Sequence, residues 1–410
     1  MRVGVYCSQI RIKAGGGYTF QTEVLKSLAV LAGESRHQFT LLVNSSAGFE
    51  EFTQAGNIDL GILPAFNPSR PRQDKNWQKI IKKKLNIENS VKKIRARVLP
   101  NHTEELSAFI KTQDIHLLWF VGPTFEEVPD VSYIATVWDL QHRLQPFFPE
   151  VSSGGEWDFR EEFFAKYLRR ASFVITGSNT GKSEIEQFYQ IPSERIKTLP
   201  HPTPGFALNA SVSDAVDIFE KFSIPHDYLF YPAQFWAHKN HVNLLLALSA
   251  LKNRNGLIVP VVFVGSDQGN LAHIRETIEQ LGLSEQVKIL GFVSHDELIA
   301  LYRNAFALGY VTFFGPDNLP PLEAFALGCP VIASDVSGAR EQLDDAALFV
   351  NPTNPEEIAD AILSLYNDPK LRDDLIERGG VIALRWTNRD FVRGVFEIVD
   401  EFENIRRCWA

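Results

Sequence analysis

The stretch GYVTFFGPDNLPPLEAFALGCPVIASDVSG, residues 309–338, decides the fold that this sequence predicts. The β-branched and aromatic residues Val311–Phe314 predict a buried strand. After a turn, Asn318 is of a residue type that caps helices. Pro320 and Pro321 then fall in the first helical turn, where a missing N–H group costs nothing. The first part of the stretch therefore predicts a strand, a turn and a helix.

The second part predicts the end of that helix and a further strand. Gly328 suits a helix C-terminus, and Pro330 blocks its continuation. Val331–Ala333 is the next predicted strand. The turn before the helix thus lies at the carboxyl end of a strand, where open α/β sheets bind ligands. Glu323 lies in the first helical turn, and its carboxylate can accept hydrogen bonds from hydroxyl groups of a ligand whose phosphates use nearby N–H groups.

These residues resemble the signature of the retaining GT-B glycosyltransferases of family 4, E-G-F-G-L-P-x-L-E followed by A-x-A-x-G-x-P-V. The matching positions are Leu319, Pro320, Leu322, Glu323, Ala324, Ala326, Gly328, Pro330 and Val331. The resemblance implies that Glu323 contacts the ribose of a donor nucleotide. Gly315 stands where the family has a first Glu that contacts the donor sugar. That contact is therefore expected from Asp317, Asn318 or nearby backbone N–H groups.

The composition is that of an ordinary globular protein. The chain has 410 residues, which favours two domains, and 45% of them are hydrophobic. A net charge of −9 argues against a protein that coats nucleic acid. Cys7, Cys329 and Cys408 are too few and too scattered for a disulfide framework or a zinc site. Because the sequence shows no membrane-spanning apolar run and no signal peptide, we expect a soluble cytoplasmic protein.

Predicted strands and helices alternate in both halves, which indicates an α/β fold with two doubly wound sheets facing across a cleft. The resemblance implies that this arrangement is the GT-B architecture. The prolines of 201–204 and the polar run that follows indicate an interdomain linker. We expect an acceptor-binding domain over 1–205 and a nucleotide-sugar-binding domain over 206–387. A final helix within 388–410 is expected to cross back to the first domain.

A glycine run, Gly15–Gly17, separates the first predicted strand from the helix Thr19–Leu31. Glycines at this point allow a backbone to approach a phosphate closely. The spacing is not the G-x-G-x-x-G pattern, and a flexible turn is the alternative interpretation. In the related family this loop lies near the donor phosphates, which implies donor contacts for Gly16 and Gly17.

The strand Tyr133–Val137 is followed by Trp138-Asp139, where the related family often has T-V-H-D-L. Trp138 stands in the position of the family's His, which lies beside the donor sugar, and Asp139 is kept as a candidate catalytic residue. Trp138 could stack on a sugar face, and His142 and Arg143 are further candidates for contacts to the acceptor or sugar. The alternative is that Trp138 belongs to the core and Asp139 caps a turn.

The segment QFWAHKNH, residues 234–241, follows a predicted strand of the second half. The family has G-R-L-x-x-x-K-N here, and its Arg and Lys hold the donor diphosphate. Lys239 matches the Lys and is the main catalytic candidate, but Gln234 replaces the Arg. Losing a cation weakens charge-assisted binding of phosphate, so Arg143 or Arg340 is expected to compensate, or turnover is modest.

The remaining candidates complete a donor site on the second domain. By resemblance, Phe292 and Val293 offer backbone groups to the nucleobase. Asn318 and Leu319, at the start of the helix, are expected beside the diphosphate, and Asp317 is the third catalytic candidate. No D-x-D metal motif is present, so we expect no metal and no cofactor besides the nucleotide-sugar donor.

Basic residues concentrate in the segment 70–97, with Trp77, Ile80, Ile81 and Leu85 at helical spacing. Such a segment fits a helix lying on an anionic membrane surface. The alternative is a helix packed on its own domain with a solvated basic face.

Together these features predict a retaining glycosyltransferase that moves a hexosyl unit from a nucleotide sugar to a saccharide or lipid-linked acceptor in polysaccharide assembly. A UDP-hexose is the first choice of donor and GDP-mannose the second. The alternative is a catalytically impaired GT-B subunit that binds a nucleotide sugar or a partner protein, because three positions depart from the family pattern (Gly315, Gln234 and Trp138).

Overall fold

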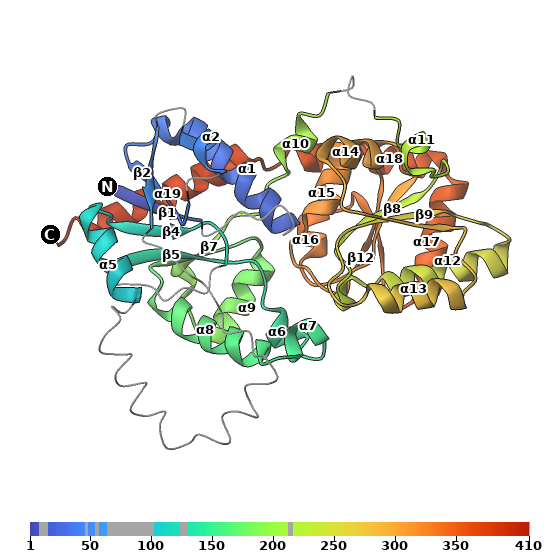
Figure 1. Cartoon of the computed structure of the whole chain (residues 1–410), viewed down its shortest axis with the longest axis horizontal. Coiled ribbons are helices and arrows are strands. Elements are labelled where there is room, and N and C mark those ends of the chain that lie inside the picture. The colour runs from blue at the N-terminus through green and yellow to red at the C-terminus, as the bar shows by residue number, and fades with distance from the viewer. Residues whose placement is uncertain are drawn as a thin grey trace, which may run out of the picture.

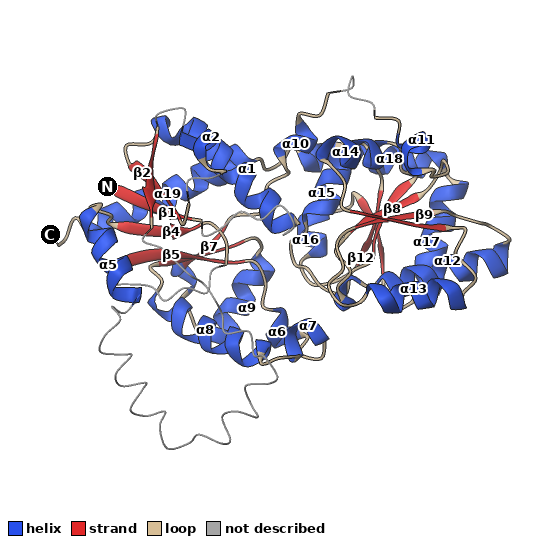
Figure 2. Ribbon diagram, in the orientation of Figure 1, coloured by secondary structure: helices blue, strands red, loops and turns tan. Residues whose placement is uncertain are grey.

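Two α/β domains lie side by side in the computed structural model, and both chain ends lie on the N-terminal one (Figure 1). The structure describes residues 1–7, 15–45, 48–53, 57–63, 102–123, 130–211 and 216–409. Each domain has a central sheet with helices on its faces (Figure 2). The basic segment 70–97 lies outside the described residues, so its membrane contact stays a prediction.

The first domain is built on a seven-stranded parallel sheet in the order β3-β2-β1-β4-β5-β6-β7. Its strands are β1 (Arg2–Tyr6), β2 (Gln38–Val43), β3 (Ile58–Ile62), β4 (Leu117–Phe120), β5 (Ser132–Val137), β6 (Phe173–Thr176) and β7 (Ile196–Thr198). Its helices are α1 (Gly16–Leu31), η2 (Ala32–Glu34), α2 (Glu50–Thr53), α5 (His102–Thr112), α6 (Gln141–Leu144), α7 (Pro149–Ser152), α8 (Glu156–Arg170), α9 (Asn179–Tyr189) and η3 (Ser193–Arg195). The short apolar strands are buried because helices cover both faces of the sheet.

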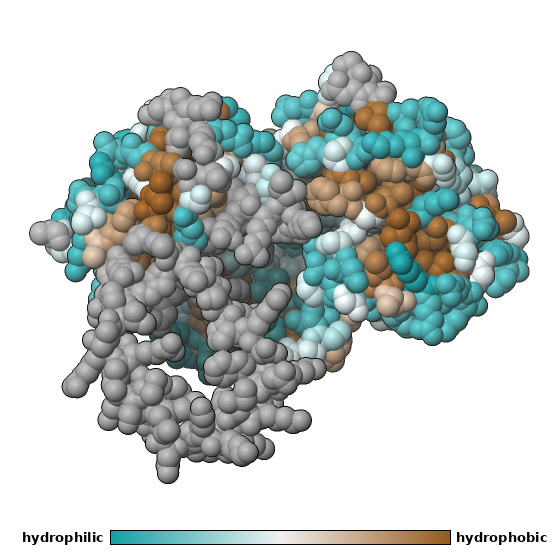
Figure 3. Space-filling view, viewed as in Figure 1, coloured by the Kyte–Doolittle hydropathy of each residue, from teal (hydrophilic) through white to brown (hydrophobic). Residues whose placement is uncertain are grey.

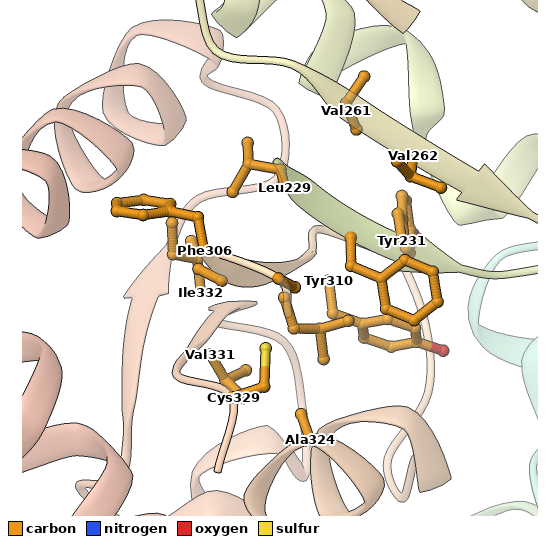
Figure 4. Packing of buried hydrophobic residues seen from close by; sticks show 14 of the residues in the cluster. Leu229, Tyr231, Val261, Val262, Phe306, Tyr310, Ala324, Cys329, Val331 and Ile332 are labelled. Carbon is orange, nitrogen blue, oxygen red and sulfur yellow. The ribbon is translucent and has the colours of Figure 1, made fainter. Parts of the chain in front are cut away.

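The second domain has a six-stranded parallel sheet in the order β10-β9-β8-β11-β12-β13. Its strands are β8 (Leu229–Pro232), β9 (Val261–Val264), β10 (Val287–Gly291), β11 (Ala307–Tyr310), β12 (Val331–Ser334) and β13 (Ala347–Val350). Its helices are α10 (Gly205–Leu208), α11 (Ile218–Phe222), η4 (Ala237–Lys239), α12 (His241–Asn255), α13 (Leu271–Gln280), α14 (His295–Arg303), α15 (Leu319–Ala326), α16 (Ala339–Leu343), α17 (Pro355–Asn367) and α18 (Pro369–Ala383). Side chains of β8, β9, β12 and α15 meet in one core (Figure 4).

The predicted strand at 311–314 is wrong by four residues. β11 covers Ala307–Tyr310, which pairs with β8 and β12, and the chain then leaves the sheet. Phe313 N–H and Thr312 Oγ1 instead donate to the carbonyl oxygen of His238, at 2.8 and 3.1 Å. The segment therefore runs as a loop against η4 and leads into α15.

The last helix, α19 (Asn388–Arg406), returns to the first domain. Its start carries a capping box, in which Thr387 and Asp390 satisfy each other's backbone N–H groups. Its apolar face packs on α1 and joins the first domain's core, and the ring of Phe391 lies 5.2 Å from that of Phe20. The strand-like linker at Thr203 pairs with Thr387, so the two connections between the domains run side by side. The predicted domain boundaries themselves stay a prediction.

Polar side chains cover much of the described surface in the view of Figure 3, with apolar areas on both domains. Among the described residues, no helix combines the length and apolar character needed to cross a membrane.

We predict that Phe391→Ala destabilises the protein by about 3–5 kcal/mol, because it empties a fully buried ring position. Urea unfolding measures the change. Glu397→Ala, at an exposed position of the same helix, is the control and should stay within about 0.5 kcal/mol of the parent. Equal midpoints for the two variants would show that α19 does not contribute to the first domain's core.

Candidate functional site

A cavity of about 540 Å³ lies between the two domains. Its walls are the loops that follow β5, β8, β9, β10 and β11, together with the starts of α1 and α15. This is the edge where open parallel sheets bind ligands. The predicted site residues that line it are Gly16, Gly17, Trp138, Asp139, Gln234, Lys239, Phe292, Val293, Asp317, Asn318, Leu319 and Glu323.

The glycine run and Trp138 form the wall contributed by the first domain. A Cβ on Gly17 would lie only 3.1 Å from two ring atoms of Trp138, so a side chain there would crowd the indole. Gly16 faces Leu319 of α15, across the domain boundary. Trp138 contacts Phe20 edge-on at 5.6 Å. The glycines therefore let α1 begin close to both the indole and the opposite domain.

His142 and Arg143 do not line the cavity, which corrects their predicted contact with the acceptor or sugar. His142 is buried, stacks on Phe164 at 5.5 Å, and places Nε2 3.0 Å from the hydroxyl oxygen of Tyr189. Arg143 is paired with Glu161. Both side chains build the packing between α6, α8 and α9, because the single turn of α6 directs them away from the opening.

The second cation of the cavity is Arg160, which the sequence reasoning missed. Among the described lysines and arginines, only Lys239 and Arg160 line the cavity. Arg160 comes from α8, which the sequence did not mark as part of the site, and its Nη1 lies 3.8 Å from Asp139 Oδ1. Arg340, expected as a compensating cation, lies outside and is paired with Asp335 at 2.7 Å.

Lys239 is held in place by two consecutive hydrogen bonds, which run through Tyr310 to Asn318. Its Nζ donates to the hydroxyl of Tyr310 at 3.1 Å and lies 5.4 Å from the centre of that ring. The Tyr310 hydroxyl donates in turn to Asn318 Oδ1 at 3.1 Å. Gln234, which replaces the family's Arg, donates from Nε2 to Ser266 Oγ at 3.1 Å. The cation and the start of α15 are thus joined by one tyrosine.

Asn318 precedes α15 as predicted, but its side chain does not cap the helix. Nδ2 donates back to the carbonyl oxygen of Gly315 at 2.6 Å. Gly315 has a φ of 142°, and a Cβ there would clash with the Asn318 amide. The loop geometry therefore favours glycine where the related family has glutamate.

Glu323 is buried at the cavity wall. Tyr302 donates a hydrogen bond to Glu323 Oε2 at 2.7 Å. Burial raises the pKa of Glu323 to about 7, although the bond from Tyr302 opposes this shift. With a pKa of about 7, this carboxyl group can either accept a hydrogen bond from a ligand hydroxyl or donate one to it at neutral pH.

Asp317 has partners other than the expected sugar. Its Oδ2 accepts a hydrogen bond from the backbone N–H of His201 at 2.7 Å, and its Oδ1 accepts one from Gln342. Only 4% of its side chain is exposed. Asp317 therefore links the loop before α15 to the interdomain linker, and its contact with a sugar stays a prediction.

Phe292 and Val293 follow β10 at the rim of the cavity. The Phe292 side chain is 63% exposed, whereas Val293 is buried. An exposed ring at the mouth of the cavity is available for stacking against a flat ligand group.

Two cross-domain residues of the cavity were also missed, Glu150 of α7 and His238 of η4. Glu150 Oε1 accepts hydrogen bonds from both the backbone N–H and Nδ1 of His238, the first at 3.0 Å. No sequence pattern indicates this pairing, because the two residues are 88 positions apart and belong to different domains.

A cluster of possible metal ligands lies elsewhere. In the part of the chain that the structure describes, His37, Asp400 and Glu403 bring ligand atoms within 4.8 Å of one another. Arg36 and the N-terminal amine pair with these carboxylates, so the cluster is an ion-pair network between α19 and the first domain.

Residues 217–380 match the family model described as Glycosyl transferases group 1. This match spans most of the C-terminal domain, from α11 to α18. The chain is 25% identical over 232 residues to an O-antigen chain mannosyltransferase B of Escherichia coli, and 28% identical over 229 residues to the O-antigen chain mannosyltransferase RfbU of Salmonella typhimurium. Each match covers 56% of this chain, and the chain spans 61% and 60% of these two curated relatives.

Solved structures show that the two domains together form a GT-B fold. A sucrose-phosphate synthase from Thermosynechococcus elongatus superposes with a TM-score of 0.71 and 15% identity, covering all of both chains. Anabaena HepE in complex with UDP-glucose superposes with a TM-score of 0.69 and 14% identity, covering 98% of this chain and 100% of that one. The two facing parallel sheets agree with this fold.

The buried imidazole of His241, two residues after Lys239, predicts a pH dependence of stability. Neither of its ring nitrogens has a hydrogen-bond partner among the described residues, and burial lowers its pKa to about 3. The unfolded chain therefore binds this proton more readily than the folded one. Stability from this residue is present above pH 6.5 and is lost as the pH falls from there toward about 3.

His241→Leu should reduce this loss of stability at acidic pH, as measured by urea midpoints between pH 7 and pH 4. At pH 7 the variant should be close to the parent, because an apolar side chain suits an unpaired buried position. His273→Gln, at an exposed histidine, serves as the control. An unchanged pH profile in His241→Leu would show that this imidazole is not the titrating group.

Proposed function

We propose that the protein is a glycosyltransferase that moves a hexosyl unit from a nucleotide sugar to a saccharide acceptor in polysaccharide assembly. The observation that carries the proposal is that Lys239 and Glu323 line one cavity between two facing parallel sheets. The O-antigen mannosyltransferases among the relatives support the same activity. The acceptor in this proposal is either a free saccharide or a saccharide linked to a lipid.

Lys239 supplies most of the charge for the donor diphosphate. The start of α15 offers little help, because Asn318 N–H is bonded to Gln342 and neither Pro320 nor Pro321 has an N–H to donate. Leu319 keeps a backbone N–H near the diphosphate. Exposed helix-dipole effects amount to about 0.3–1 kcal/mol, which is small beside a charge-assisted hydrogen bond from an ammonium group.

The other parts of the donor have matching surfaces along the second domain. In the proposal Glu323 accepts the ribose hydroxyls and Phe292 and Val293 hold the base, and their lining of one cavity supports these roles. Gly16 and Gly17 let the first domain approach the phosphates. Gln234 offers an amide where the related family has a guanidinium, so its contribution is a neutral hydrogen bond.

The acceptor enters along the first domain, where Trp138 offers a ring for a sugar face and Asp139 a carboxylate. Arg160, which lies beside Asp139, supplies the second cation that was expected of Arg143. In the reaction, the bond from the anomeric carbon to the diphosphate breaks and negative charge grows on the leaving phosphate. Lys239 stabilises that charge. The leaving phosphate accepts the proton of the attacking hydroxyl on the same face, which retains the anomeric configuration.

The donor is a hexose carried by a nucleoside diphosphate. The sequence reasoning placed UDP-hexoses ahead of GDP-mannose, and the mannosyltransferase relatives reverse this order in the proposal. The UDP-glucose complex of HepE keeps uridine donors in the test. A thermal-shift panel of UDP-, GDP- and ADP-sugars separates these donors, because each bound ligand raises the melting temperature.

We predict that Lys239→Ala and Glu323→Ala each lower sugar transfer by about 10²-fold or more, as the loss of a transition-state contact typically does. Release of nucleoside diphosphate in the presence of an acceptor measures the rate. Arg340→Ala removes a cation outside the cavity and is the matched control. If the parent protein releases no diphosphate from any donor yet binds one of them or a partner protein, it is the silent GT-B subunit instead.

The segment 70–97 predicts binding to anionic membranes. Replacing its lysines and arginines by glutamine should weaken sedimentation with vesicles that contain anionic lipid, since each basic residue near the lipid contributes about 1 kcal/mol. Neutral vesicles are the control. Equal sedimentation of parent and variant would contradict membrane contact.

A further inference from the structure

One segment of the first domain, residues 145–150, packs directly on the loop that carries Lys239. Gln145 Nε2 donates to the carbonyl oxygen of Phe313 at 2.9 Å. The ring of Phe148 lies 5.6 Å from Phe313 and 6.2 Å from His238. Glu150 then reaches His238 itself. The residue next to Lys239 is therefore fixed from the opposite domain.

The hydrogen bonds define the state of the His238 ring. Although burial acts to raise it, the bonds from His238 hold the pKa of Glu150 below its ordinary value, so this carboxylate is ionised and can only accept. His238 Nδ1 must then carry the proton that it donates. Burial lowers the pKa of His238, so the ring is neutral at pH 7 and Nε2 holds a lone pair.

A lone pair at this place suits a hydroxyl group and not a phosphate. His238 lines the cavity beside Lys239, and the structure assigns no partner to its Nε2 among the described residues. An unprotonated imidazole nitrogen repels phosphate oxygens but accepts a hydrogen bond from an O–H group. The cavity therefore offers a cation and a hydroxyl acceptor on adjacent residues.

We propose that Glu150 and His238 form a cross-domain pair in which His238 Nε2 accepts a hydrogen bond from a sugar hydroxyl and Glu150 acts as the positioning residue. This inference rests on the proposed function and adds a specificity contact to it. The imidazole would thereby distinguish a sugar that has this hydroxyl from one that lacks it. Because Glu150 belongs to the first domain, the contact is complete only where the two domains meet.

Deoxygenated substrates test the contact. With the parent protein, one deoxy analogue of the donor sugar or of the acceptor sugar should lose about 3- to 10-fold in kcat/KM, the size of one neutral hydrogen bond. His238→Phe keeps an aromatic ring but has no acceptor, so the same analogue and the full sugar should react equally. Glu150→Gln should show an intermediate preference. Gln145→Ala, which removes a neighbouring cross-domain bond, should keep the parent's preference.

The results separate the two proposals. If His238→Phe no longer prefers the full donor over a deoxy donor analogue, and still binds the nucleoside diphosphate like the parent, the hydroxyl belongs to the donor. If His238→Phe instead no longer prefers the full acceptor over a deoxy acceptor analogue, the hydroxyl belongs to the acceptor. If the parent transfers sugar but His238→Phe keeps its preference for every hydroxyl, the pair is overturned and the proposed function stands. If the parent neither binds nor transfers any nucleotide sugar, both are overturned.

Discussion

The geometry of the cavity depends on the buried carboxylate of Asp317, which joins the loop before α15 to the linker between the domains. It accepts a hydrogen bond from the backbone of His201 and another from Gln342. Burial acts to lower the pKa of His201, but the charge and hydrogen bonds of Asp317 hold it above its ordinary value. Gly177 leaves space for this carboxylate, since a side chain there would clash with it. Moving the domains apart would therefore expose an ion pair and displace the loop that leads into α15.

The same kind of bond recurs around the domain boundary. Glu23 accepts from Gly205 N–H at 3.0 Å, Glu150 accepts from His238 N–H, and Glu341 accepts from two N–H groups at the start of α9, at 2.6 and 3.1 Å. Carboxylate bonds to backbone N–H groups are charge-assisted and stronger than neutral ones. They also constrain the backbone directly, so they fix how loops of one domain stand against the other. Acidic side chains thus set the domain arrangement of this acidic protein.

The sequence predicted what depends on local patterns. The alternating strands, the turn before α15 and the residues Lys239 and Glu323 could be read from spacing and from the family signature. The cross-domain pairs could not, because Glu150 meets His238 only after two separately folded sheets are brought together. Arg160 escaped notice because α8 reaches the cavity only through packing within the first domain, which no local pattern indicates. The strand at 311–314 was misplaced because its β-branched residues Val311 and Thr312 are buried in a loop and not in the sheet.

The return of α19 to the first domain has a consequence for synthesis on the ribosome. Phe391, Val395 and Val399 complete a core whose other residues are made at the opposite end of the chain. Domains generally fold in the order in which they emerge. Here the earlier domain must wait with an uncovered apolar face until the later one has been translated. A nascent chain of this design is exposed to chaperones and proteases for longer than two domains joined in simple succession.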